Sequence, residues 1–201
     1  MQSISELNTF AKEMLGERLE DSTKKIILEL ERNQTAIRRG YLTKFNELFQ
    51  DCIEQQQCGQ KGNAAYVHIF YLNSALYTQK YELQLQVFDQ MSYLDKSECM
   101  ALWMPELFAK HFHDDMEWFE RVASQQIVGF RYSHMMEIKR KYYTIYLGMI
   151  GQFFLREAAQ IAELPSYKNM KKVEGIQIIF GGYMDQGIQI WPPLEVQVES
   201  G

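Results

Sequence analysis

Residues 65–72 read Ala-Tyr-Val-His-Ile-Phe-Tyr-Leu, and residues 83–87 read Leu-Gln-Leu-Gln-Val. The first stretch is β-branched and aromatic with apolar groups on both faces, which is typical of a central β-strand. The second alternates apolar and polar residues, as a half-buried strand does. The link over residues 73–81 is longer than a tight turn. We still expect the two strands to pair antiparallel, as a hairpin over residues 65–89.

A second pair of extended stretches lies near the C-terminus. Apolar residues alternate with glutamines over residues 176–180 and 188–190. Residues 181–187 between them contain glycine and aspartate, which favour turns, so the pattern predicts a hairpin over 175–191. An isolated hairpin is only marginally stable, so we expect both hairpins to join in one antiparallel sheet. The side chains expected to face the helices are Leu83, Leu85, Val87, Ile176, Ile178, Ile188 and Ile190; those expected to face away are Gln84, Gln86, Gln177 and Gln189.

The rest of the chain has a helical pattern. Apolar residues recur at spacings of three and four over residues 3–57 and 96–163. Gly16 and the polar residues 21–23 lower the helix propensity in the middle of the first stretch, so we expect either one helix or two there. Asp95 and Glu98 have the spacing of a capping box and predict a helix start. The fold class is α+β, mainly helical, with one small antiparallel sheet packed on helices, and residues 1–201 form a single domain.

The composition is that of a globular protein. The chain has 201 residues, of which 46% are hydrophobic and 23% charged, and this excludes wholesale disorder. Its net charge of −5 provides no field for phosphate binding, so we expect no nucleic-acid partner. No stretch reaches the ~20 apolar residues of a membrane span, and the start resembles no signal peptide. Three cysteines without a Cys-x-x-Cys pattern indicate reduced thiols in the cytoplasm.

The polar cluster with the most potential ligand side chains lies at residues 111–115, which read His-Phe-His-Asp-Asp. On a helix His111 shares a face with Asp114, while His113 points the opposite way, so the two histidines cannot chelate one ion. His68, His134 and Glu137 could join His111 and Asp114 in a ligand site. The chain contains no Glu-x-x-His, no Gly-x-Ser-x-Gly and no phosphate-binding loop. We therefore expect no catalytic set, no metal and no cofactor.

The stretch over residues 132–163 carries interface-type side chains on the longest predicted helix. At ~1.5 Å per residue it would span ~45 Å, longer than a small domain is wide. Tyrosine and methionine suit contact surfaces, which makes Tyr142, Tyr146, Met149 and Phe153 candidate interface residues. The sequence favours a non-catalytic cytoplasmic interaction or assembly subunit, bound to another protein or to itself as a homodimer. The alternative is a small enzyme or ligand sensor that uses the residues around His111, Asp114 and His134.

Overall fold

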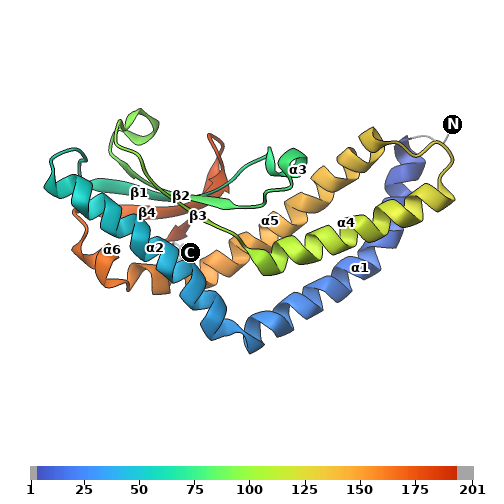
Figure 1. Ribbon diagram of the computed structural model, residues 1–201, viewed down its shortest axis with the longest axis horizontal. Helices are drawn as coiled ribbons and strands as arrows, with labels where there is room; N and C mark the ends of the chain where they lie inside the picture. The colour runs from blue at the N-terminus through green and yellow to red at the C-terminus, as the bar shows by residue number, and fades with distance from the viewer. Residues whose placement is uncertain (1–3, 194–201) are drawn as a thin grey trace, which may run out of the picture.

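The computed structural model describes residues 4–193, with side chains from Leu7 onward, so the predicted helix start at residue 3 lies outside the described residues. A five-stranded sheet lies at one end of the elongated chain, and a helical arm made of α1, α4 and α5 extends from it (Figure 1). The elements are α1 (Ile4–Arg32), α2 (Gln34–Gln57), β1 (Ala64–Tyr71), α3 (Ala75–Thr78), β2 (Leu83–Asp89), the 3₁₀ turn η1 (Ser92–Leu94), β3 (Cys99–Trp103), α4 (Glu106–Gln126), α5 (Tyr132–Ala162), α6 (Pro165–Asn169), β4 (Lys172–Gly182) and β5 (Gly187–Trp191).

The sheet has the strand order β3-β2-β1-β4-β5, with β1 in the centre. The predicted α+β class and the antiparallel pairing of β1 with β2 are confirmed. The expectation of a purely antiparallel sheet is wrong, because β1 and β4 pair in parallel. The chain returns from β3 to β4 through three helices, and a crossover of that length can bring a strand back in the parallel direction.

The strand β3 replaces the helix start that was predicted near residue 96. Asp95 does not cap a helix. Its carboxylate accepts hydrogen bonds from the backbone N–H of Asp89 at 3.0 Å and of Ser97 at 2.9 Å, and so fixes the loop that leads into β3. Lys61 donates to the same carboxylate at 2.6 Å. The residues after Asp95 therefore enter the sheet as its edge strand.

The predicted orientation of the strands holds with one exception. Six of the seven apolar side chains expected to face the helices are buried, but Ile188 is 69% exposed. Ile188 follows the β4–β5 turn on the edge strand, where no helix covers it. Gln86, expected to face away from the helices, is buried on that opposite face, where its Nε2 lies 3.4 Å from Oε1 of Glu98. One face of the sheet thus packs on the helices and the other is partly covered by loops.

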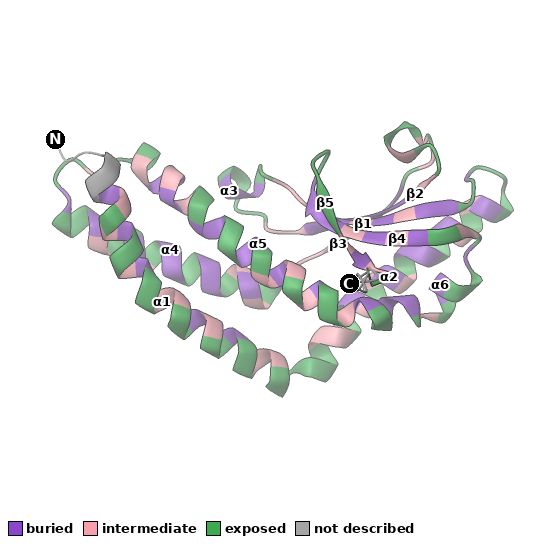
Figure 2. Cartoon of the chain, turned by 180° about the vertical axis from the view of Figure 1, so that it is seen from behind, coloured by how far each residue is buried: buried purple, intermediate pink, exposed green. Residues whose placement is uncertain are grey.

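The arm is built from three long helices that lie side by side (Figures 1 and 2). α1 is a single unbroken helix despite Gly16, and α5 follows the predicted stretch 132–163 to within one residue. One half of α5 packs with α1 and α4, while the other half passes under the sheet. There, Gly151 allows a close approach, because a Cβ atom at that position would lie 3.1 Å from the Phe180 ring. No helix among residues 4–193 is long and apolar enough to cross a membrane.

A buried carboxylate joins the three helices of the arm. Asp115 on α4 is 1% exposed and accepts hydrogen bonds from the hydroxyls of Ser22 at 2.9 Å and Tyr146 at 2.8 Å. The Tyr142 hydroxyl lies 3.4 Å from its second oxygen, and Nε of Arg18 lies 2.8 Å from its first. Because α1 and α5 both send polar groups to this single acceptor, the network fixes the register of the arm.

Candidate protein-binding groove

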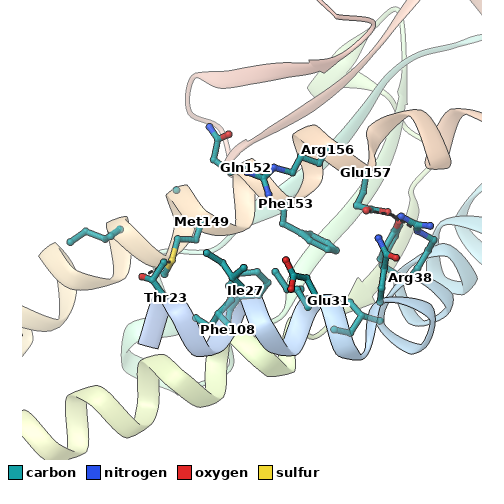
Figure 3. Close-up of a pocket in the computed structure, with 17 residues that line it drawn as sticks. Thr23, Ile27, Glu31, Arg38, Phe108, Met149, Gln152, Phe153, Arg156 and Glu157 are labelled. Atoms are coloured by element: carbon teal, nitrogen blue, oxygen red, sulfur yellow. Dashed lines mark hydrogen bonds and ion pairs between the residues drawn. The ribbon is translucent and has the colours of Figure 1, made fainter. Parts of the chain in front are cut away.

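A groove of about 560 Å³ runs between α1 and α5, close to the elbow where α1 joins α2 (Figure 3). We call it the α1–α5 groove. Its floor is formed by Phe108 and Ile26, which are 3% and 2% exposed. Ile27 belongs to the wall on α1, and Met149 and Phe153 belong to the wall on α5. The lining is mainly apolar, as is usual where proteins bind other molecules.

The walls of the groove follow from helical periodicity. The lining residues on α5 are Ile145, Gly148, Met149, Gln152, Phe153, Arg156 and Glu157, and those on α1 are Thr23, Ile26, Ile27, Leu30 and Glu31. Both sets have spacings of three and four residues, so each forms one continuous stripe along its helix. No heavy atom lies within 4 Å of a Cβ built at Gly148, so the wall is open at that point.

An ion pair closes the elbow end of the groove. Arg38 on α2 donates from Nε and Nη2 to the two carboxylate oxygens of Glu157 at 2.8 and 2.9 Å, and the Tyr41 hydroxyl donates to the same carboxylate. Partial burial by itself would raise the pKa of Glu157, but hydrogen bonds from Arg38 and Tyr41 outweigh it and hold that pKa below its ordinary value. Burial and this same bond raise the pKa of Tyr41. Glu157 therefore stays ionised at neutral pH.

The rim of the groove is exposed and carries one charge of each sign. Ile27 is 48% and Ile145 is 44% exposed. Glu31 on α1 and Arg156 on α5 lie on opposite walls (Figure 3). Neither charge has an ion-pair or hydrogen-bond partner among residues 4–193, in contrast to the paired Arg38 and Glu157. Apolar side chains in water beside unpartnered charges are typical of a surface that binds a partner.

The four candidate interface residues are divided between the groove and the core. Met149 and Phe153 line the α1–α5 groove. Tyr142 and Tyr146 are 6% and 1% exposed and point to Asp115 inside the arm. The sequence pattern thus located the helix that forms the groove wall, while two of its tyrosines belong to the packing behind it.

The candidate ligand residues on α4 do not form a site with the other candidates. Nε2 of His111 lies 3.2 Å from a carboxylate oxygen of Glu29 on α1, and His111 is 7% exposed. Asp114 is exposed, and its backbone carbonyl lies 3.4 Å from Nη2 of Arg18. Both contacts are made with α1, so this part of the predicted cluster belongs to the packing of the arm.

The remaining candidates lie in two other places. At the start of α5, Nδ1 of His134 accepts from the backbone N–H of Arg131 at 3.3 Å, and Glu137 accepts from Lys141 at 2.8 Å. His68 lies on the loop-covered face of the sheet, stacked on Phe70 with ring centroids 4.6 Å apart. Within residues 4–193 no three His, Cys, Asp or Glu side chains form a group that could hold a metal ion.

Acid is expected to destabilise the protein through His68. Burial lowers the pKa of His68 to about 4 from an ordinary value of 6.5, so the unfolded chain takes up this proton first. The contribution of His68 to the free energy of unfolding is then fully present above its unfolded pKa of 6.5, and it falls as the pH decreases from 6.5 to 4. We expect a loss of about 1–2 kcal/mol between pH 7 and pH 5. Urea unfolding at the two pH values should show this loss reduced in His68→Phe, whereas His113→Gln, at an exposed histidine, retains it; an unchanged pH dependence in His68→Phe would contradict the assignment.

The residues that close the groove were missed by sequence reasoning. Arg38 and Glu157 are 119 positions apart, and no local pattern connects them. The exposure of Ile27 likewise follows from no local pattern, because it depends on how far α1 diverges from α5. No family model matches this chain, and no curated protein or solved structure matches it significantly. The function is therefore inferred from the groove itself.

Proposed function

We propose that this protein is a non-catalytic assembly subunit that binds a second copy of itself through the α1–α5 groove. The observation that carries the proposal is the rim, where exposed apolar side chains lie beside one unpartnered acid and one unpartnered base. We place this subunit in the cytoplasm, where its thiols remain reduced.

A two-fold axis suits this distribution of charge. In a symmetric dimer every contact between two different residues is made twice, once in each direction. Glu31 of one copy can then meet Arg156 of the other, and the reciprocal pair satisfies the remaining two charges. The exposed ridge of α1 around Ile27 would lie in the groove of the other copy, as ridges pack into grooves between helices. An amphipathic helix of another protein would need to supply both charges independently.

The apolar contact provides most of the expected affinity. Complete burial of one large aliphatic side chain contributes roughly 1.5–3 kcal/mol. Ile27 and Ile145 from both copies, with the partly buried Met149 and Phe153 beneath them, can form the dry centre of an interface. The exposed charges at the rim contribute less, about 0.2–1 kcal/mol for each pair, and act mainly on specificity.

Met149→Asp is expected to convert the dimer to a monomer without unfolding it. The substitution places a charge in the apolar wall, where association would have to desolvate it. Light scattering at tens of micromolar should give the dimer mass for the natural chain and the monomer mass for Met149→Asp, with unchanged circular dichroism. Ala159→Asp, on an exposed part of α5 outside the groove, is the matched control and should remain dimeric. A monomeric natural chain, or dissociation by both variants alike, would contradict the proposal.

Charge reversal tests the two-fold arrangement separately. Glu31→Arg and Arg156→Glu should each weaken the dimer severalfold, because each variant places like charges together at both symmetric contacts. The double variant should restore the natural dissociation constant. Sedimentation equilibrium of the four chains measures the coupling. Additive weakening in the double variant would show that the two side chains do not meet in the dimer.

A further inference from the structure

A small cavity lies on the face of the sheet that does not pack on the helices. Its volume is about 230 Å³, and it is enclosed by β2, by the connection from β2 to β3 and by the β4–β5 turn. Both connections project from the sheet on the side away from α2 (Figure 1). The residues that line this cavity and those that line the α1–α5 groove are entirely different, so the two sites are separate.

Buried polar contacts hold the loop that forms one wall of the cavity. The side chain of Lys61 is fully buried and donates to the Asp95 carboxylate and to the backbone carbonyl of Ser97, both at 2.6 Å. Asp95 also accepts from the backbone N–H of Asp89 at the end of β2. The wall is therefore in place before any ligand arrives, and the charge of Asp95 is already balanced by Lys61.

Gln86 brings an unpaired hydrogen-bond acceptor to the cavity. It is one of the lining residues and is 5% exposed, and its Oε1 atom is buried without a hydrogen-bond partner among residues 4–193. Nε2 of the same amide lies 3.4 Å from Oε1 of Glu98, and this contact fixes which end of the amide is the oxygen. A buried acceptor without a donor is unfavourable, so a ligand that donates an N–H to it would gain affinity.

The other lining side chains favour a positively charged donor. Glu98 makes no ion pair with the side chains described from Leu7 to residue 193, and its carboxylate has only the long contact with Gln86. Phe88, Tyr93 and Tyr183 also line the cavity; the Tyr93 ring centroid lies 5.3 Å from that of Phe88 and 6.1 Å from that of Tyr183. Aromatic rings attract cations, and a free carboxylate adds to this attraction.

We propose that this cavity binds a primary alkylammonium group, which donates to Oε1 of Gln86 and to the carboxylate of Glu98. Such a group carries three N–H donors, enough for both acceptors. A water molecule occupies ~30 Å³ in the liquid, so the cavity has room for the ammonium group and the first carbons of its chain. The opposing charge in the lining is Lys96, which is exposed and can extend its side chain into water.

Titration of the full-length chain with n-butylammonium tests the proposal. Amide chemical shifts of residues around the cavity should change and reach saturation at about 1–10 mM ligand. Tetramethylammonium, a cation without N–H donors, and n-butanol, a neutral analogue, should each bind at least about tenfold more weakly. The proposal is overturned if n-butylammonium causes no saturable change, which would mean that the cavity holds water only, or if either analogue binds equally well.

Substitutions in the lining identify the groups that bind the cation. Glu98→Gln and Gln86→Leu should each weaken the binding of n-butylammonium about tenfold, because each removes an acceptor for a charged donor. Lys96→Met should strengthen it severalfold by removing a like charge. Glu174→Gln and Gln84→Leu, which lie outside the cavity on β4 and β2, should leave the affinity unchanged. Glu98 is exposed, so unaltered affinity in a folded Glu98→Gln variant would contradict the assignment.

A free amine and a lysine side chain of another protein present the same ammonium group. The tripeptide acetyl-glycyl-lysyl-glycine amide distinguishes them: it should bind at least as tightly as n-butylammonium if the natural ligand is a lysine side chain, and be excluded if the ligand is a free amine. Both results support an ammonium site. Met149→Asp, in the α1–α5 groove, should bind n-butylammonium with unchanged affinity, so this site and the proposed dimer stand or fall separately.

Discussion

Asp115→Ala is expected to lower the free energy of unfolding by about 3–5 kcal/mol, because removal of one member of a buried charged network leaves its partners unpaired. Arg18 loses its counter-charge, and the hydroxyls of Ser22 and Tyr146 lose the acceptor that they share. Urea unfolding followed by circular dichroism measures the change.

The neighbouring Asp114 provides the control for this substitution. Asp114 is exposed, and its side chain makes no hydrogen bond or ion pair with the side chains described from Leu7 to residue 193, so Asp114→Ala should change the stability by no more than about 0.5 kcal/mol. Asp115→Asn keeps one acceptor oxygen and should fall between the two. Equal losses for Asp114→Ala and Asp115→Ala would contradict the view that one carboxylate joins the three helices.

Lys61→Met is expected to lower the free energy of unfolding by a similar amount, about 3–5 kcal/mol, because it leaves the buried carboxylate of Asp95 without its counter-charge. The side chains of Lys61 and Asp95 are 0% and 4% exposed, so the carboxylate would remain buried without its ammonium partner. Lys96→Met, at the exposed lysine next to Asp95, should change the stability by no more than about 0.5 kcal/mol. The double variant Lys61→Met with Asp95→Asn should recover part of the loss, since a neutral amide needs no counter-charge; strictly additive losses would show that the pair is not coupled.

The same pair predicts how stability changes in acid. Partial burial would raise the pKa of Asp95, but bonds from Lys61 and from the N–H groups of Ser97 and Asp89 outweigh it and lower that pKa. The stability that this carboxylate contributes is therefore complete above its unfolded pKa, near 4. It is lost only as the pH falls further, through the lower pKa of the folded state. This range lies below the one expected for His68, so the two effects can be separated in a single pH series.

The elements that could be predicted are those whose pattern is local. α5 carries an apolar stripe over its whole length, and β1 is apolar on both faces, so each is determined by its own residues. β3 was missed because Cys-Met-Ala-Leu-Trp is apolar throughout and too short for its period to distinguish strand from helix. The parallel pairing of β1 with β4 depends on the crossover between them, which no local pattern contains.

The candidate site was harder to predict because its residues are distinguished only by tertiary contacts. Asp114 and Asp115 are adjacent and chemically identical, yet only Asp115 meets a hydroxyl 93 positions away on α1. Met149 and Tyr146 lie within one turn of α5, but one faces the groove and the other faces the arm core. Helical periodicity locates such a stripe without showing which neighbour covers it.

The central position of β1 has a consequence for how the chain folds during synthesis. Its antiparallel neighbour β2 already begins at Leu83, but its parallel neighbour β4 begins only at Lys172. Pairings so distant in the chain form slowly, and the ribosome must deliver α4, α5 and α6 first. Until then one hydrogen-bonding edge of β1 stays open beside Val67 and Ile69. A nascent chain halted before β4 is therefore expected to be recognised by chaperones or to aggregate through that edge, whereas release of the complete chain closes it.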